Sequence, residues 1–430
     1  MTQRTTHSRR RLIAVGMASA AALILAGCAP SGAEPAASDS SSPAAASQSF
    51  KVGLLASTTG FAASMGKDLQ QGWDLYWSQH DNKSGNFTLS SVFEDDASDP
   101  QTALTKAKKL VTEDKVDVVV GPVLANNSLA VADYLNQQKV ANLSQTSADD
   151  ITQRKFSPVV LRTGAMGGSQ TTFAAGQWAW DEGHKTASTL CPDYAFGWDS
   201  CAGFVSSFTA AGGTISKQLW YPNGTTDMST YVAQLKSAGA DVLFAGTTGG
   251  TDATGFLKSA SDFGLLKSSP VITGCCTLGT ATLANLGDMT LGVFSSSYYV
   301  EGAKQSAEFL KAFEAKYNVI PSVYSAGAYA TAQMLDAALK TAKTKVTGED
   351  LIKAIKDADL KGNVFGDVSF DDHNNIVGPV FIREVEKRND GKLWNVNKKT
   401  YDDVSQFWTF DAKEFLSQPT FSQSNNGQQK

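Results

Sequence analysis

Two polar segments, at residues 124–128 and 144–150, each follow a predicted buried strand. The β-branched run at residues 116–120 predicts the first strand, and Gly121-Pro122 ends it because proline has no N–H to donate. Asn126, Asn127 and Ser128 suit a helix start, and we expect a helix at residues 129–138 and a strand at residues 140–143. Ligands of open α/β sheets lie at the carboxyl ends of strands, so the two polar segments predict a binding site.

Signatures of catalysis are missing from the sequence. It contains no Gly-x-Ser-x-Gly elbow, Walker loop, HExxH, GxGxxG fingerprint or paired-carboxylate pattern. The acidic and hydroxylic residues 94–99 have the composition of a cation site, but Asp99 before Pro100 is also a standard helix start. We favour the helix start, and we do not expect an enzyme.

The composition is that of an ordinary globular protein. The 430 residues, 18% of them charged and 42% hydrophobic, are enough for two domains. A formal net charge of −5 with scattered Lys and Arg provides no basic surface, so no nucleic-acid partner is expected. Beyond the N-terminus there is no apolar run of about 18 residues or more, so no membrane span is expected in the body of the chain.

The N-terminus has the anatomy of an export signal. Residues 9–11 are Arg-Arg-Arg, residues 12–26 are apolar, and residues 25–28 read Leu-Ala-Gly-Cys, which resembles a bacterial lipobox. That resemblance implies a lipoprotein signal peptide at residues 1–27 and lipidation of Cys28; the twin-arginine and general secretory routes both fit. Residues 28–48 are mostly Ala, Ser and Pro and predict a flexible tether, and residues 417–430 predict a flexible tail.

Four cysteines lie in the part of the chain expected to be exported. Disulfides are allowed outside the cytoplasm, and four cysteines permit three connectivities. We favour Cys191 with Cys201, the nearest non-adjacent pair, over pairings with Cys275 or Cys276. The sequence has no CxxC pair and its four histidines are far apart, so neither a metal site nor a cofactor is expected.

Strands and helices alternate over most of the chain, which predicts α/β architecture with parallel sheets covered by helices on both faces. A first series begins at residue 50 and a second at residue 159. A β-rich part closes the chain, with strands expected at residues 364–370, 380–386 and 393–396.

Seven segments spread over nearly the whole chain carry a family resemblance. They are residues 51–55 (with Thr59-Gly60 and Ser64-Met65-Gly66), 94–100, 117–122, 161–163, 194–197, 221–227 and 368–371. In this order and spacing they resemble the type I periplasmic binding proteins of the branched-chain amino acid (Leu/Ile/Val-binding) class, which serve ABC importers.

The resemblance implies two doubly wound parallel-sheet lobes joined by three crossings, with the ligand in a cleft between them. Lobe one would comprise residues 49–163 and 294–376, and lobe two residues 164–293 and 377–416. Hinge closure around the ligand produces the form that docks on an ABC permease. Lipid on Cys28 would hold the protein, as a monomer, at the outer face of the cytoplasmic membrane.

Amino-acid binders of this family hold the ligand carboxylate through hydroxyls and N–H groups of lobe one, and the ammonium through an acid of lobe two. Here Leu124 or Ala125 stands at the hydroxyl position, and Cys275 stands near the position of the acid. An unpaired buried ammonium is costly, so an aromatic or other organic acid or amide is favoured over a simple amino acid. Asp252 and Glu301 stay open as displaced partners for an ammonium.

The residues expected to line the cleft are of three kinds. Apolar walls are expected from Phe61, Met65, Tyr194, Phe196, Trp198 and Tyr298. Directed hydrogen bonds are expected from Asn126, Thr146, Ser147, Thr247 and Thr248. Ala125 and Cys275 are expected at the two positions where this chain differs from the amino-acid binders. This mixture of apolar surface and a few polar groups is typical of small-molecule pockets, although each aromatic residue by itself also fits core packing. Uptake of branched-chain or other amino acids, and ligand sensing for a membrane receptor, are the alternative functions.

Overall fold

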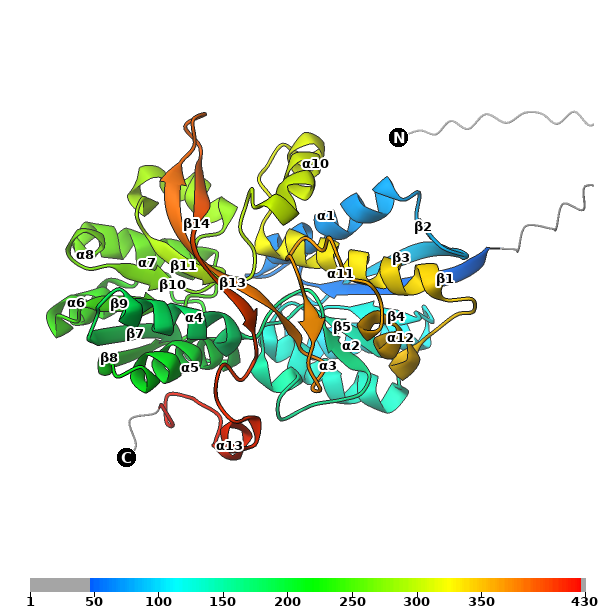
Figure 1. The fold of residues 1–430 in the computed structure, drawn as a ribbon, viewed down its shortest axis with the longest axis horizontal. Coiled ribbons are helices and arrows are strands. Elements are labelled where there is room, and N and C mark those ends of the chain that lie inside the picture. Colours follow the sequence, from blue (N-terminus) through cyan, green and yellow to red (C-terminus); the bar gives the residue numbers. More distant parts are fainter. Residues whose placement is uncertain (1–46, 427–430) are drawn as a thin grey trace, which may run out of the picture. The chain divides into compact units, whose positions relative to one another are not determined.

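Two mostly parallel sheets covered by helices make up the part of the chain that the structure describes. The computed structural model describes residues 47–426, so the predicted signal peptide, Cys28 and nearly all of the tether lie outside the described residues. The first sheet has the strand order β2-β3-β1-β4-β5-β6, and the second β12-β13-β11-β10-β9-β7-β8, with β14 paired to β13 (Figure 1). The α/β class predicted from the sequence is confirmed.

The first sheet forms lobe one. It contains β1 (Gln48–Ala56), β2 (Lys83–Ser84), β3 (Phe87–Asp95), β4 (Val118–Val120), β5 (Ala141–Ser144) and β6 (Val160–Arg162). All pair in parallel except β2, which is antiparallel to β3. The helices of this series are α1 (Ala63–Gln79), α2 (Pro100–Thr112) and α3 (Ala125–Gln138), followed by the 3₁₀ turn η1 (Asp149–Ile151).

The start of α2 decides between the two interpretations of residues 94–100. Asp99 is the N-cap and accepts a hydrogen bond from the Thr102 N–H, and Pro100 is the first helical residue. Glu94 is held by Lys106 and Lys109. The acidic segment is therefore a capped helix start, as favoured from the sequence.

The second sheet forms lobe two. Its strands are β7 (Thr186–Pro192), β8 (Thr214–Tyr221), β9 (Val242–Ala245), β10 (Val271–Thr273), β11 (Phe294–Ser297), β12 (Ser369–Phe370), β13 (Ile376–Lys387) and β14 (Leu393–Val404). Its helices are α4 (Gly168–Asp181), α5 (Ala195–Ala210), α6 (Ser229–Ala238), α7 (Thr251–Asp262), α8 (Leu265–Ser268) and α9 (Thr280–Leu286), with the 3₁₀ turn η2 (Gly287–Thr290) after α9. β7 to β11 pair in parallel, while β13 runs antiparallel to β11.

After β11 the chain returns to lobe one and then crosses back. The 3₁₀ turn η3 (Lys304–Ser306) leads to α10 (Ala307–Tyr317), then α11 (Val323–Thr341) packs alongside α1, and α12 (Gly348–Lys356) packs against β5. The predicted boundary at residue 294 is wrong at β11, because Phe294–Ser297 pairs with β10 and β13 in the second sheet. The middle crossing therefore follows Ser297. Within residues 47–426, no helix has the length and apolarity needed to cross a membrane.

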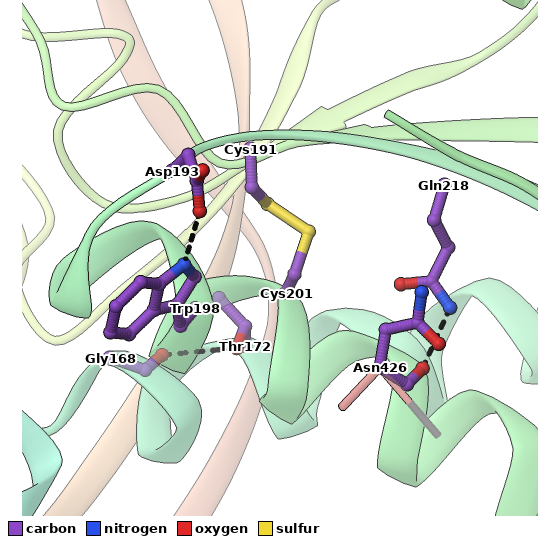
Figure 2. Close-up of a disulfide and its surroundings, with 8 residues drawn as sticks. All are labelled: Gly168, Thr172, Cys191, Asp193, Trp198, Cys201, Gln218 and Asn426. Atoms are coloured by element: carbon purple, nitrogen blue, oxygen red, sulfur yellow. Dashed lines mark hydrogen bonds between the residues drawn. A yellow bond between two sulfur atoms is a disulfide. The ribbon is translucent and has the colours of Figure 1, made fainter. Parts of the chain in front are cut away.

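A disulfide joins the end of β7 to α5. It links Cys191 with Cys201, the pair favoured from the sequence (Figure 2). α5 begins at Ala195, whereas the sequence pattern places the helix at residues 201–211 and a loop before it. Gly197 allows the early start, because the first turn of α5 approaches the Pro192 carbonyl so closely that a Cβ would lie 1.9 Å from that oxygen.

The end of the described chain makes defined contacts. After α13 (Ala412–Ser417), Gln418 accepts a hydrogen bond from Arg154, and a bridge pairs Ser422 with Asn425. The side chain of Gln218 on β8 donates to the Asn426 carbonyl (Figure 2). These contacts join the segment after α13 to Arg154 and to β8.

Candidate functional site

A cavity is enclosed by loops that follow strands of both sheets. Lobe one contributes the segments after β4 and β5, and lobe two the segments after β7, β9, β10 and β11. The lining residues are Met65, Val123, Leu124, Ala125, Gln145, Thr146, Ser147, Tyr194, Phe196, Thr248, Cys276, Tyr298 and Tyr324. The cavity thus lies at the carboxyl ends of the strands, where α/β sheets bind ligands.

Most of the residues predicted to line the cleft lie on this cavity. They are Met65, Ala125, Thr146, Ser147, Tyr194, Phe196, Thr248 and Tyr298. They come from both lobes, so the structure brings together groups that are more than 200 residues apart in the chain. Whether they contact a ligand stays a prediction.

Three residues that were predicted to line the cleft are not among the residues that line the cavity. Phe61 is 51% exposed in the loop before α1, and Asn126 is exposed on the first turn of α3. Trp198 lies within α5, where its indole N–H donates to Asp193 at 2.8 Å (Figure 2). Asn126 and Trp198 miss the cavity because residues one or two positions away on a helix face a different direction.

Two other predicted residues lie behind the lining. The Thr247 hydroxyl is buried and hydrogen bonds with the Thr277 hydroxyl at 2.8 Å, so it ties two loops of lobe two together. Cys275 is buried, and its neighbour Cys276 is the one that lines the cavity.

The sequence interpretation omits five lining residues from its site list. They are Val123, Leu124, Gln145, Cys276 and Tyr324. All except Tyr324 lie within two positions of a predicted residue, so the predicted loops already contained a signal for them. Tyr324 comes from the start of α11, far from any strand end, and only the packing of α11 brings it to the cavity.

Lobe two offers a hydroxyl pair to a ligand. The Tyr194 hydroxyl lies 3.0 Å from the Thr248 hydroxyl, and either atom can donate. Burial raises the pKa of Tyr194, so its O–H stays protonated at neutral pH and remains a hydrogen-bond donor.

The two carboxylates considered as displaced ammonium partners are engaged elsewhere. Asp252 accepts hydrogen bonds from the Tyr221 hydroxyl at 2.7 Å and from the Thr248 N–H at 2.9 Å. Glu301 is buried, accepts from Asn395 and lies 3.8 Å from a guanidinium nitrogen of Arg383. Neither side chain lines the cavity, and no charged side chain is among its lining residues in the described part of the chain.

The N-terminus of α3 gives the lining an electropositive feature. Ala125 is its first residue, Leu124 is the N-cap, and no side chain caps the helix start. The first N–H groups of a helix have no intrahelical partner and carry the positive end of the helix dipole. An anionic ligand group placed here would find both donors and a favourable field.

Arg162 holds the second lobe-one loop of the cavity in place. Its guanidinium donates to the carbonyls of Thr146 and Ala148 and to the side chain of Asn375, while its own N–H donates to the Asn374 carbonyl. Arg162 is fully buried, so it positions the loop without reaching the cavity. One side chain thereby connects the first crossing, the ligand-facing loop and the third crossing.

A groove of about 650 Å³ adjoins the cavity. It shares Met65, Cys276 and Tyr324 with the cavity and is lined by residues of both lobes. Asp68 on α1 also lines it; burial raises the pKa of this carboxyl to about 6, although a hydrogen bond with Ser322 opposes the shift.

Comparison with known proteins identifies the family. A family model described as periplasmic binding protein matches residues 49–392. The chain belongs to this family. It is a substrate-binding protein of the ABC-importer class, with a small-molecule ligand and a permease as partners, and the resemblance inferred from the sequence is confirmed. Proteins of this family are exported.

Relatives of this chain cover more than four fifths of it. Leu/Ile/Val-binding protein homolog 6 of Brucella melitensis is 29% identical over 82% of this chain and 91% of its own length. A solute-binding protein of an ABC transporter from Rhodopseudomonas palustris BisB5, solved with 3,4-dihydroxybenzoic acid, is 30% identical, with a TM-score of 0.78 over 83% of this chain and 98% of its own. An R. palustris homologue solved with 4-hydroxybenzoate is 28% identical, with a TM-score of 0.78 over 84% of this chain and 99% of its own.

Replacing Arg162 tests its role as the positioning residue. R162M removes every side-chain hydrogen bond from the guanidinium and leaves buried carbonyls unpaired, so we expect the free energy of unfolding to fall by about 3–5 kcal/mol. R154M is the matched control, because Arg154 is a partly exposed ion-pair partner of Asp150 and its loss costs only about 1 kcal/mol or less. Urea unfolding measures both variants, and equal losses would contradict the assignment.

The raised pKa of the Asp68 carboxyl should make the free energy of unfolding depend on pH. Between its ordinary pKa of 3.8 and its folded pKa of about 6, the folded protein binds more protons than the unfolded chain, so stability is lost as pH rises through this window. D68N does not titrate, so the free energy of unfolding of the wild type minus that of D68N should fall from about pH 4 to pH 6 and then level off. For D227N the corresponding difference should instead rise with pH, and mainly below about pH 4, because the Ser229 N–H lowers the pKa of the exposed Asp227 from 3.8. Urea unfolding from about pH 3 to pH 7 measures both.

Proposed function

We propose that this protein captures a small aromatic carboxylate and delivers it to an ABC permease. The observation that carries the proposal is the composition of the cavity: aromatic side chains of lobe two and lobe-one apolar groups surround a space without a charged side chain, and the open start of α3 faces it. A flat aromatic ring suits such walls.

The lining supports a specific division of roles. The ligand carboxylate would lie at the α3 N-terminus, beside Ala125 and Ser147, where N–H groups and the helix dipole stabilise a negative charge. The ring would pack between the lobes against Phe196 and Tyr298. The hydroxyls of Tyr194 and Thr248 would hydrogen bond to a substituent on the ring.

Known relatives support the same ligand class. The R. palustris solute-binding proteins solved with 3,4-dihydroxybenzoic acid, p-hydroxybenzoic acid and benzoate are 26–30% identical to this chain and share its fold. The Brucella relatives are named for leucine, isoleucine and valine. An amino acid is the second candidate, but its ammonium would have to be paired without a carboxylate in the lining, at a large cost in free energy.

The same proposal extends to the setting of the protein. A lipid on Cys28 would tether a monomer to the outer face of the cytoplasmic membrane, close to the permease. Lobe one would comprise residues 49–163 together with the segment from residue 298 to about 368. The protein would bind its ligand without chemical change, because neither a nucleophile–base pair nor a metal-binding pattern emerges from the sequence. The alternative is that closure of the two lobes around the ligand signals to a membrane receptor instead of a permease.

Ligand class is tested by thermal shift. A ligand that binds only the folded protein raises its stability by about 2.7 kcal/mol when present at one hundred times its Kd. We expect benzoate, 4-hydroxybenzoate and 3,4-dihydroxybenzoate to raise the melting temperature more than leucine does at equal concentration. A shift with leucine, isoleucine or valine alone would overturn the proposal.

The position of the carboxylate is tested by a matched pair of charge substitutions. A125D places a negative charge at the helix start inside the cavity, and we expect the affinity for 4-hydroxybenzoate to fall by about tenfold or more, because like charges at short range repel by several kcal/mol. N126D adds the same charge at the exposed neighbouring position and should weaken binding much less. Isothermal titration calorimetry measures both, and equal effects would mean that the carboxylate binds elsewhere.

A further inference from the structure

Two adjacent cysteines at the end of β10 form an unusual pair. The Cys275 and Cys276 sulfur atoms lie 2.7 Å apart, both side chains are buried, and neither is joined to another residue. Within the described residues the other cysteines are already paired as Cys191–Cys201. The pair therefore contains two thiols in direct contact.

The position of the pair exposes one sulfur to the ligand path. Cys276 lines both the cavity and the adjoining groove, next to Tyr324, while Cys275 lies behind it. The backbone is held from behind, because Arg383 donates to the Cys275 carbonyl at 3.3 Å. A Cβ on Gly274 would meet no atom within 4 Å, so the chain has room to adjust just before the pair.

We propose that Cys275 and Cys276 are oxidised to a vicinal disulfide that forms part of the wall of the ligand cavity. The contact between the sulfur atoms, the access of Cys276 from the groove and the export of this family all favour it, since disulfides form and persist outside the cytoplasm. The Cys191–Cys201 disulfide in the same chain fits that setting.

The oxidation requires an external disulfide, such as an exported disulfide oxidoreductase or oxidised glutathione. The Cys276 thiolate attacks one sulfur of that oxidant and releases its other sulfur as a thiol. Cys275 then loses its proton and attacks the Cys276 sulfur, which breaks the mixed disulfide and releases the second thiol of the oxidant. Two protein thiols are oxidised to one disulfide, and the disulfide of the oxidant is reduced to two thiols.

The arrangement of the thiols suits Cys276 as the attacking group. A hydrogen bond from Cys275 lowers the pKa of Cys276, and Tyr324 adds to that effect. The thiolate is the reactive form of cysteine. Cys276 is also the member of the pair that lines the groove, so its sulfur is the one that an oxidant can reach when the lobes part.

A disulfide at this place would reduce the conformational freedom of one wall of the cavity. Sulfur makes favourable contacts with aromatic rings, and the ring formed by two adjacent cysteines has less freedom than two thiols. If the ligand is an aromatic acid, as proposed above, its affinity should be about two- to tenfold higher for the oxidised protein than for the reduced protein. This last step rests on the proposed function, but the disulfide itself does not.

The disulfide is tested by peptide mapping of the full chain isolated from its exported location. Trypsin releases residues 268–304 as a peptide that contains only these two cysteines, and residues 186–217 as a peptide that contains only Cys191 and Cys201. After denaturation with iodoacetamide and no reductant, we expect the first peptide to be unalkylated and lighter by two hydrogens than its reduced form. Alkylation of both cysteines in that peptide, with the second peptide still oxidised, would overturn the proposal.

The role in the cavity wall is tested with C275S and C276S. Both variants lose the disulfide, but C275S leaves the lining side chain unchanged. We expect both to bind 4-hydroxybenzoate about two- to tenfold more weakly than the oxidised wild type. Unchanged affinity in C275S would refute a role for the disulfide in the wall. A wild type that binds no aromatic acid would overturn the ligand class, and the peptide map would still decide the disulfide.

Discussion

The buried guanidinium of Arg162 is the interaction on which the rest of this structure depends. It lies where the chain first leaves lobe one, and it binds the carbonyls of the Thr146–Ala148 segment and the side chain of Asn375 near the third crossing. A buried charge must be compensated, and carboxylates of Asp149 and Asp199 lie near enough to oppose the lowering of the Arg162 pKa by burial. The hinge region and the ligand-facing loop therefore share one set of contacts.

The cavity next to this hinge has no charged side chain among its lining residues in the described part of the chain. Carboxylates that a sequence interpretation can offer to an ammonium, Asp252 and Glu301, are used to fix lobe-two loops. What lines the cavity is the uncapped start of α3 and a set of aromatic and hydroxyl groups. Leaving a charge unpaired in such surroundings costs more free energy than any single hydrogen bond contributes.

The errors in the sequence interpretation have a common physical origin. Trp198 was expected to line the cleft, but it lies within α5 and its indole N–H donates to Asp193. The strand Phe294–Ser297 was assigned to lobe one, but pairing with β13 keeps it in the second sheet. Both outcomes depend on segments that are close in space, and local residue preferences do not report such contacts.

By itself the sequence determined the α/β class, because periodic apolar residues and strand-ending Gly-Pro are local signals. Only the tertiary structure decided which side chains meet. Tyr324 reaches the cavity through the packing of α11, and Cys276 rather than Cys275 faces the ligand path. The direction of a side chain on a helix or loop depends on how that element packs against its neighbours, and this packing is a property of the whole fold.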